Sequence, residues 1–208
     1  MKIGVFDSGK GGAYVAERLR TLLPEHEYIE ANDHNHVPYG DREQSEIFAL
    51  TNAAIQPLLV QCNLIVIACN TATAAAIDEL RDRYPQHRFV GYEPMIKPLA
   101  SLTSHGVLLA TQATRESSRY QLLKAAYGNI KIDEPDTTNW AHFIEEGTPE
   151  RIDLSELDSA IDSGATVISL SCTHYLALQD MLTVRYPQVT IIEPTEAVAK
   201  RITALLAH

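Results

Sequence analysis

The sequence predicts an α/β protein made of two similar halves, each with a mainly parallel sheet. Short apolar runs typical of strands alternate with helical periodicity along all 208 residues. Two stretches roughly a hundred residues apart can be laid over each other, and both place a cysteine where a strand gives way to a helix. We therefore expect two pseudo-symmetric α/β domains, with the functional site in the cleft between them.

Composition and charge exclude several classes of protein. Hydrophobic residues make up 45% of the chain, enough for a large buried core. The 17 basic and 27 acidic residues give a net charge of -10 and are scattered, which argues against nucleic acid or an anionic membrane as partner. The longest apolar run, residues 64–69, is too short to span a bilayer, and no signal-peptide segment follows Met1. We expect a cytoplasmic protein whose three cysteines are reduced.

The first half begins with a strand at residues 2–6, a glycine-rich turn at 7–12 and a helix that ends before Pro24. Four apolar side chains should form the buried face of this helix: Val15, Leu19, Leu22 and Leu23. Three further strands are predicted, at residues 27–31, 64–68 and 88–92. Two further helices are predicted, one at 43–61 with a kink at Pro57 and one after residue 70.

The second half repeats this alternation. Its strands are predicted at residues 106–109, 130–132, 166–170 and 189–192. Its helices are predicted from the turn at 111–114 to about 126, at 140–146, around 154–161 with Gly164 as a left-handed cap, and after His174. A last helix, from Thr195, should bury Val198, Ile202, Leu205 and Leu206. We expect one domain at residues 1–97 and a second at 98–194, with the helix at 195–208 packing back on the first.

The internal repeat carries most of the functional information. Residues 66–71 match residues 168–173, so Cys69 corresponds to Cys172, and an Arg-Tyr-Pro-Gln motif and a Glu-Pro motif recur downstream of both. Because ligands of parallel α/β sheets bind at the carboxyl ends of the strands, the two cysteines should face each other across one cleft. A single cysteine at a strand end is usually a small buried hydrophobe, and Cys62, which has no counterpart, is expected to be one.

Two facing thiols suit a reaction that removes a proton from one face of a carbon atom and returns one to the other. A helix N-terminus favours the thiolate, and both cysteines are expected in that setting. A thiolate on one side and a thiol on the other invert the configuration at Cα, which is racemisation or epimerisation.

Other chemistries fit the same residues less well. Acyl transfer by a cysteine and histidine pair leaves the second cysteine unexplained, because His174 is only two residues from Cys172. A metal site made of Cys69, Cys172 and His174 lacks the spacing of paired ligands. The turn at 8–12 lacks the glycine patterns of phosphate-binding loops, and its glycines are expected to permit a tight strand-to-helix turn.

Five motifs follow one another along nearly the whole chain. They are Phe6-Asp7-Ser8-Gly9-x-Gly11-Gly12, Val37-Pro38-Tyr39-Gly40, Ala68-Cys69-Asn70-Thr71-Ala72-Thr73, Ala110-Thr111-x-Ala113-Thr114 and Cys172-Thr173-His174-Tyr175. Together they resemble the glutamate racemases of the aspartate/glutamate racemase superfamily. The resemblance implies an enzyme without cofactor or metal that uses two catalytic cysteines in a cleft between two pseudo-symmetric domains. It also implies glutamate as the small-molecule partner and a possible homodimer.

The resemblance implies four catalytic groups: Cys69 and Cys172 as the two bases, Asp7 assisting the first and His174 assisting the second. From the residues alone, Asp7 could also be a helix N-cap and His174 a surface or capping residue. The resemblance further places an acidic residue near the site at Glu145, although the adjacent Glu146 leaves a solvated helix face as an equal alternative.

Hydroxyls, amides and helix N-termini are available to bind the carboxylates of an acidic amino acid. They belong to Ser8, Asn70, Thr71, Thr114 and Thr173. The resemblance adds three loop residues that contact substrate, Pro38, Tyr39 and Gly40.

The sequence departs from the family pattern at a few positions. Lys10 stands where a small or apolar residue is usual, Ser171 replaces the usual glycine before Cys172, and the segment before Glu145 lacks a common Cys-Pro. These departures leave three hypotheses. The first is a glutamate racemase that supplies D-glutamate for peptidoglycan. The second is a racemase of aspartate or another acidic amino acid. The third is a non-catalytic relative that binds an amino acid or acts as a regulator.

Overall fold

Two four-stranded parallel sheets organise the computed structural model, which describes residues 1–127 and 129–207. The first sheet has the order β2-β1-β3-β4 and the second the order β6-β5-β7-β8. The strands of the first are β1 (Lys2–Asp7), β2 (Glu27–Asn32), β3 (Leu64–Ile67) and β4 (Arg88–Gly91). The strands of the second are β5 (His105–Leu109), β6 (Lys131–Asp133), β7 (Val167–Leu170) and β8 (Thr190–Ile192). The identical order confirms the predicted pseudo-symmetric α/β fold.

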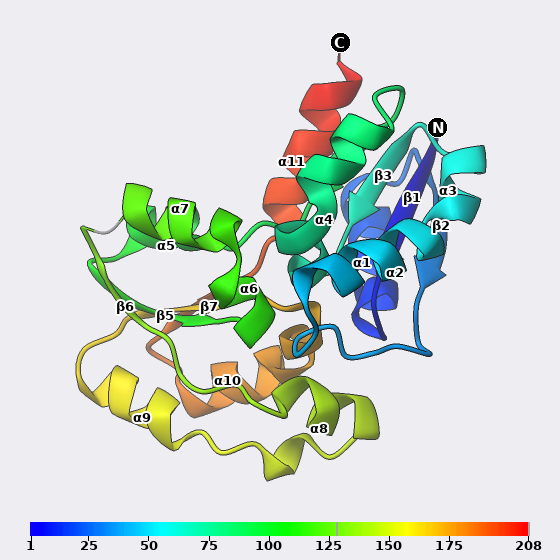
Figure 1. The fold of residues 1–208 in the computed structure, drawn as a ribbon. Coiled ribbons are helices and arrows are strands. Elements are labelled where there is room, and N and C mark those ends of the chain that lie inside the picture. Colours follow the sequence, from blue (N-terminus) through cyan, green and yellow to red (C-terminus); the bar gives the residue numbers. More distant parts are fainter. Residues whose placement is uncertain (128, 208) are drawn as a thin grey trace.

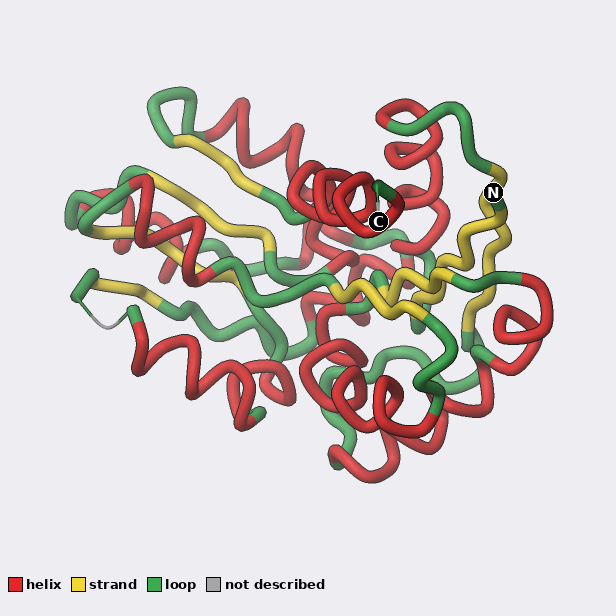
Figure 2. Tube along the Cα trace, turned by 90° about the horizontal axis from the view of Figure 1, so that it is seen from above, coloured by secondary structure: helices red, strands yellow, loops and turns green. Residues whose placement is uncertain are grey.

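Helices flank both sheets, as Figures 1 and 2 show. Those of the first half are α1 (Gly11–Leu22), α2 (Gln44–Ala54), α3 (Gln56–Gln61) and α4 (Asn70–Arg83). Those that follow are α5 (Ile96–Leu102), α6 (Gln112–Glu116), α7 (Ser118–Ala126), α8 (Trp140–Glu146), α9 (Ser155–Asp162) and α10 (Gln179–Arg185), with 3-10 helices η1 (Pro149–Arg151) and η2 (Thr173–Leu178). The last is α11 (Thr195–Leu206). None of the helices that the structure describes has the length and apolar character of a membrane span.

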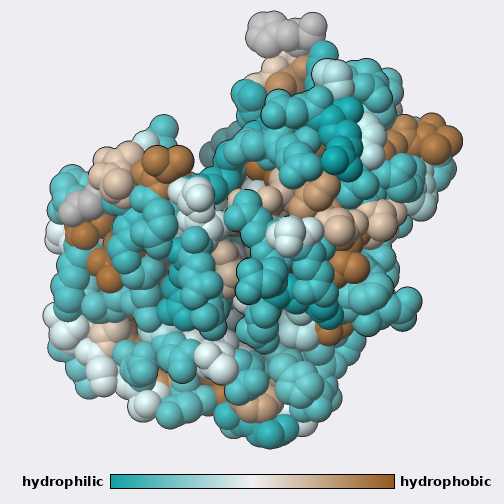
Figure 3. Space-filling view, in the orientation of Figure 1, coloured by the Kyte–Doolittle hydropathy of each residue, from teal (hydrophilic) through white to brown (hydrophobic). Residues whose placement is uncertain are grey.

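The apolar core is continuous between the halves. One cluster of buried residues covers a face of both sheets, with Val5 and Val66 from the first and Val107 and Ile168 from the second. Smaller clusters fill the opposite faces. In the orientation of Figure 1 the surface is largely hydrophilic, with apolar side chains in scattered groups (Figure 3).

Several local predictions were wrong for identifiable reasons. The helix expected at 43–61 is two helices, because Pro57 occupies the first turn of α3 and begins a new helix instead of kinking one. The helix expected to run to residue 126 is also divided, since Ser117 ends α6 and caps α7 by accepting from the N–H of Tyr120. Helix α5 was not predicted, and the expected domain boundary at 97/98 falls inside it.

Four leucines are less buried than their spacing predicts. Leu22 is exposed, while Leu23 after α1 and Leu205 and Leu206 in α11 are half-buried, because each lies at or near the end of its helix. Gly164 has the positive φ expected of it, 103°. His208, the last residue of the predicted terminal helix, lies outside the described residues.

The chain crosses between the sheets twice. It leaves β4 for α5 and returns from β8 to α11, which packs against α1 and β4. The Glu-Pro motifs of the repeat, at Glu93 and Glu193, lie in these two crossings. The hydroxyl of Tyr92 and Oγ1 of Thr195, 3.0 Å apart, form a buried hydrogen bond between them.

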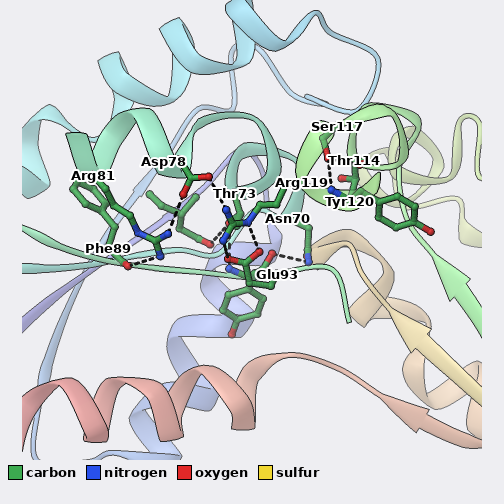
Figure 4. A network of polar contacts seen from close by, with 12 residues as sticks. Asn70, Thr73, Asp78, Arg81, Phe89, Glu93, Thr114, Ser117, Arg119 and Tyr120 are labelled. Atoms are coloured by element: carbon green, nitrogen blue, oxygen red, sulfur yellow. Dashed lines mark hydrogen bonds and ion pairs between the residues drawn. The ribbon is translucent and has the colours of Figure 1, made fainter. Parts of the chain in front are cut away.

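An ion-pair network ties the first crossing to both halves. Arg119 of α7 forms a two-pronged interaction with the carboxylate of Glu93, at 2.5 and 2.6 Å, and its third nitrogen donates to Asp78 of α4 at 2.7 Å (Figure 4). Ser171 makes a further contact with this crossing, because its buried hydroxyl accepts a hydrogen bond from the backbone N–H of Met95 at 3.2 Å. Ser171 therefore anchors the crossing segment to the end of β7.

The packing of α11 predicts that the C-terminal helix stabilises the first half. Ile202 is fully buried in the shared cluster. Replacing Ile202 with Ala should lower the free energy of unfolding by about 2–5 kcal/mol, because it removes packed methyl groups and leaves a cavity. Denaturant unfolding measures this, with Val60→Ala as control: Val60 is 86% exposed, and its truncation should change stability by less than about 0.5 kcal/mol. Equal effects of the two substitutions would contradict the docking of α11.

Candidate active site

Cys69 lies where β3 ends and α4 begins. It is the N-cap residue of α4, and its Sγ accepts a hydrogen bond from the backbone N–H of Ala72 at 3.4 Å. Strands β1 and β3 are parallel neighbours, so the turn after β1 reaches the same sheet edge. There Ser8 donates its hydroxyl to the sulfur of Cys69 at 3.4 Å. The two residues therefore meet as the strand order predicts.

Cys172 occupies the equivalent position after β7. The expected α-helix does not start there: the six-residue 3-10 helix η2 follows, and α10 begins only at Gln179. The sulfur of Cys172 therefore lacks the helix hydrogen bond that Cys69 receives. Its partner is instead His174, whose Nδ1 lies 3.7 Å from Sγ.

His174 joins Cys172 to a carboxylate of α8. Its Nε2 lies 2.7 Å from Oε1 of Glu145, and the imidazole is buried, so the alternative of a surface histidine is wrong. The neighbouring Glu146 pairs with Arg151 and His142 on the exposed side of α8. The geometry thus decides between the two glutamates: Glu145 contacts the buried His174, and Glu146 lies on the exposed side of the helix.

Asp7 links the two halves. Its Oδ2 accepts from the backbone N–H of Gly9 and its Oδ1 from the hydroxyl of Thr173, both at 2.8 Å, and the side chain is fully buried. The N-cap position of α1 belongs to Lys10, so Asp7 is not a helix cap. It stabilises the turn and binds a residue next to Cys172.

The glycines of the turn are required by close approach and not by its backbone conformation. The positive φ angles among the described glycines are at Gly147 and Gly164, outside the turn. A Cβ on Gly9 would lie 2.4 Å from Oε1 of Glu145 and 2.9 Å from Nε2 of His174. A Cβ on Gly11 would lie 2.5 Å from the Cβ of Thr173. Gly9 and Gly11 are therefore required because the second half packs directly onto the turn. A Cβ on Gly12 would lie 2.7 Å from the Cβ of Asp7, so this glycine permits the tight turn as expected.

Three threonines form a hydroxyl cluster between the halves. Oγ1 of Thr71, in the first turn of α4, lies 2.9 Å from that of Thr111, which donates to Thr114 at 3.0 Å. Gly40 lies alongside, since its carbonyl accepts from the N–H of Ala113 at 3.0 Å. The cluster thus connects predicted binding residues of both halves.

Asn70 and Tyr39 make contacts within the first half, whereas Pro38 lies at the boundary with the second. Nδ2 of Asn70 donates to the carbonyl of Tyr92, while its buried Oδ1 has no partner in the part of the chain that the structure describes. Tyr39 packs near Phe6, and its hydroxyl donates to Asp33 at 2.7 Å. Pro38, with Gly40, Thr111 and Tyr175, lines a small cavity of about 20 Å³.

The electrostatics differ on the two sides of the site. Burial, followed by the charge of Asp7, raises the pKa of Cys69 to about 12, which outweighs the bonds from Ser8 and Ala72. The helix N-terminus alone does not make this thiol acidic, contrary to expectation. The charge of Cys172 contributes to the same shift, so the two sulfurs lie within electrostatic reach of each other.

The histidine side carries a buried ion pair. Burial alone would lower the pKa of His174, but hydrogen bonds with Cys172 and Glu145 raise it to about 10. The bond with His174 in turn lowers the pKa of Glu145 to about 2. At neutral pH the pair is therefore imidazolium and carboxylate, and the cation lies 3.7 Å from the sulfur of Cys172.

This arrangement can carry out two-sided proton transfer. A thiol of high pKa stands on the first half, and a thiol beside an imidazolium stands on the second. Each has a polar partner that could exchange a proton with it.

Some residues of the site were missed from the sequence. Thr111 was quoted within a motif but not as a site residue, although a threonine three positions before Thr114 at a predicted turn is a helix N-cap signal. Glu145 could have been preferred over Glu146, because it lies four residues after the apolar Ala141 and shares its helix face.

Comparison with known proteins identifies the family. A family model described as Asp/Glu/Hydantoin racemase matches residues 13–202. The glutamate racemase of Herpetosiphon aurantiacus is 38% identical over 215 residues, which cover 99% of this chain and 84% of that protein.

Solved structures agree with this match. One is Escherichia coli glutamate racemase in complex with L-glutamate and the activator UDP-MurNAc-Ala, with a TM-score of 0.84, 30% identity and coverage of 100% of this chain and 82% of that one. Another is glutamate racemase from Francisella tularensis in complex with D-glutamate, with a TM-score of 0.81, 27% identity and coverage of 99% and 80%. This chain therefore belongs to the Asp/Glu/hydantoin racemase family, and within it to the glutamate racemases.

Proposed function

We propose that this protein interconverts L- and D-glutamate without a cofactor and supplies D-glutamate for peptidoglycan. The observation that carries the proposal is the pair of thiols at equivalent strand ends of two sheets, each with its own polar partner. The relatives named as glutamate racemases, and the related structures that hold L- or D-glutamate, support glutamate as the substrate. The connected positions of Cys69, Asp7, Cys172 and His174 favour a catalyst over a protein that only binds an amino acid.

In one direction Cys172 acts as the base and Cys69 as the acid. The thiolate of Cys172 removes the α-proton, so the Cα–H bond breaks and an S–H bond forms. The Cα carbanion then takes the proton of Cys69 from the opposite face, which inverts the configuration. The two cysteines have exchanged protonation states, and the same steps in reverse convert the other enantiomer.

Neighbouring groups serve this cycle. The imidazolium of His174, held by Glu145, stabilises the thiolate of Cys172. Asp7 lies beside the first thiol and, by raising its pKa, favours the protonated form that acts as the acid. Because Asp7 also accepts a hydrogen bond from Thr173, it holds the two sides of the cleft together.

The substrate's charged groups find complementary partners in the hydroxyls and the N-terminus of α4. Thr71 and Thr114, together with Thr173, offer hydroxyl donors to the carboxylates. The unpartnered Oδ1 of Asn70 is an acceptor available to the ammonium group. Pro38, Tyr39 and Gly40 form the loop wall of the site in this proposal.

The proposed chemistry also bears on location and assembly. Both thiols must stay reduced, and the cytoplasm keeps cysteines in that state. We therefore place the reaction there, which is also where the sequence predicts the protein. The possible homodimer stays a prediction.

Replacing either Cys69 or Cys172 with Ala should reduce racemisation of glutamate by about 10²–10⁴-fold or more, because each removes one of the two proton carriers. Proton NMR in heavy water follows loss of the α-proton signal, and chiral chromatography follows the product. Cys62→Ala is the matched control, since Cys62 is a third buried thiol at the end of α3. Full activity in a Cys69→Ala, Cys172→Ala double variant would contradict the mechanism.

Replacing Glu145 with Gln should shift the alkaline limit of activity to lower pH. The carboxylate helps to hold the pKa of His174 near 10, so its neutral isostere lets that pKa fall toward the ordinary value of 6.5. Above the new pKa the imidazolium is lost, and with it the stabilisation of the Cys172 thiolate. The profile of kcat/KM between about pH 6 and pH 10 measures the shift.

Glu146→Gln is the control for this experiment, because the neighbouring carboxylate pairs with Arg151 and His142 instead. Its profile should match that of the unmodified protein. Identical profiles for Glu145→Gln and the unmodified protein would exclude the proposed role of the ion pair.

The choice of glutamate over aspartate is tested with both amino acids side by side. We expect faster α-proton exchange with glutamate at equal concentration. Exchange with aspartate alone would transfer the assignment to an aspartate racemase. Binding without exchange of either, in folded and reduced protein, would favour a non-catalytic relative.

A further inference from the structure

Lys10 reaches from the glycine-rich turn to the opposite side of the candidate site. Its Nζ donates to the backbone carbonyl of Glu145 at 2.6 Å and lies 3.6 Å from Oε2 of the same residue. Its backbone N–H donates to Oε1 of Glu145 at 3.0 Å. Glu145 thus receives three interactions from one residue, while its Oε1 also meets His174.

These interactions join two elements that belong to different halves. Lys10 precedes α1, which packs on β1 and β2 of the first sheet. Glu145 lies in the last turn of α8, which packs on η2 of the second half. The carbonyls at the end of a helix carry partial negative charge, so an ammonium group is stabilised there.

The ammonium adds interactions that a small residue cannot supply. Any amino acid at position 10 would provide the backbone N–H, but the bond to the carbonyl and the ion pair need the lysine side chain. The side chain of Lys10 is 64% exposed and that of Glu145 is 13% exposed. The contact therefore lies at the rim, with the buried His174 and Cys172 behind it.

The reacting groups are nearly closed off from solvent in this structure. Cys69 and Cys172 are each 4% exposed and Asp7 is fully buried, so substrate cannot reach them through the closed arrangement. A Cβ on Gly9 would lie 2.4 Å from Glu145, which shows how closely the turn meets α8 when the rim is shut. A contact across the rim stabilises the closed form.

We propose that Lys10 is a positioning residue that closes the cleft over bound glutamate by holding Glu145 and the end of α8 against the glycine-rich turn. The inference rests on the proposed function. The contact of Asp7 with Thr173, which also crosses the cleft, involves groups assigned to the reaction or to binding. Lys10 acts through Glu145, so its removal affects how tightly substrate is held and leaves the proton carriers in place.

Lys10→Met should raise the KM for glutamate about fivefold, because an exposed ion pair changes an equilibrium constant by at most about this factor. The value of kcat should stay within about twofold of that of the unmodified protein. Lys10→Arg keeps the charge and should restore most of the affinity. Raising KCl from about 0.02 to about 0.3 M screens exposed charges, so it should raise the KM of the unmodified protein and have a smaller effect on Lys10→Met. A purely structural effect would not produce this salt dependence.

Lys2→Met is the matched control. Lys2 is a half-exposed lysine that pairs with Glu27 at 3.8 Å within the first sheet, away from the cleft. Its KM and salt response should equal those of the unmodified protein. A KM in Lys10→Met equal to that of the unmodified protein, or a similar rise in Lys2→Met, would overturn the role of Lys10.

The order of measurement separates this inference from the proposed function. Unmodified protein is tested first for α-proton exchange in heavy water. No exchange with glutamate would overturn the proposed function and this inference together. Normal exchange with no change of KM in Lys10→Met would overturn the role of Lys10 alone.

Discussion

The parallel alignment of strands in two equivalent sheets is the constraint on which the site depends. Parallel strands end at one edge, so the segments after β1 and β3 meet in the first half, as do those after β5 and β7 in the second. Because the sheets share one strand order, each edge carries a cysteine at the same place. The remaining groups then need only short turns to reach a sulfur: Ser8 follows β1, and His174 lies two residues after Cys172.

Symmetry of the backbone does not extend to the charges. Cys69 has a helix N-terminus, a hydroxyl donor and a buried carboxylate nearby, and the balance favours the protonated thiol. Cys172 has an imidazolium held by Glu145. In the proposed mechanism one thiol is protonated while the other is not, and the two states exchange with each turnover. The duplicated fold places the two sulfurs at equivalent strand ends, and unequal side chains surround them.

The sequence predicted the architecture well because its signals are local and repeated. The Arg-Tyr-Pro-Gln motifs illustrate this: in both halves the tyrosine directly follows an α-helix, Tyr84 after α4 and Tyr186 after α10. Contacts between the halves could not be predicted in the same way. Lys10 and Glu145 are 135 residues apart, and no local pattern reports that they meet. The reason for Gly9 likewise lies in a distant helix, and the pKa of Cys69 depends on burial, which a motif does not measure.

The double crossing of the chain has a consequence for how the protein is made. The first sheet is assembled from residues 2–91, but α11, which packs against α1 and β4, is synthesised only after the whole second half. Domains generally fold as units during synthesis, and a unit cannot complete its core before all its parts exist. The second sheet and its helices are contiguous in the chain and so can fold earlier. On the ribosome the first half therefore cannot complete its core until the second half has been synthesised, and part of its apolar surface stays uncovered until α11 is made.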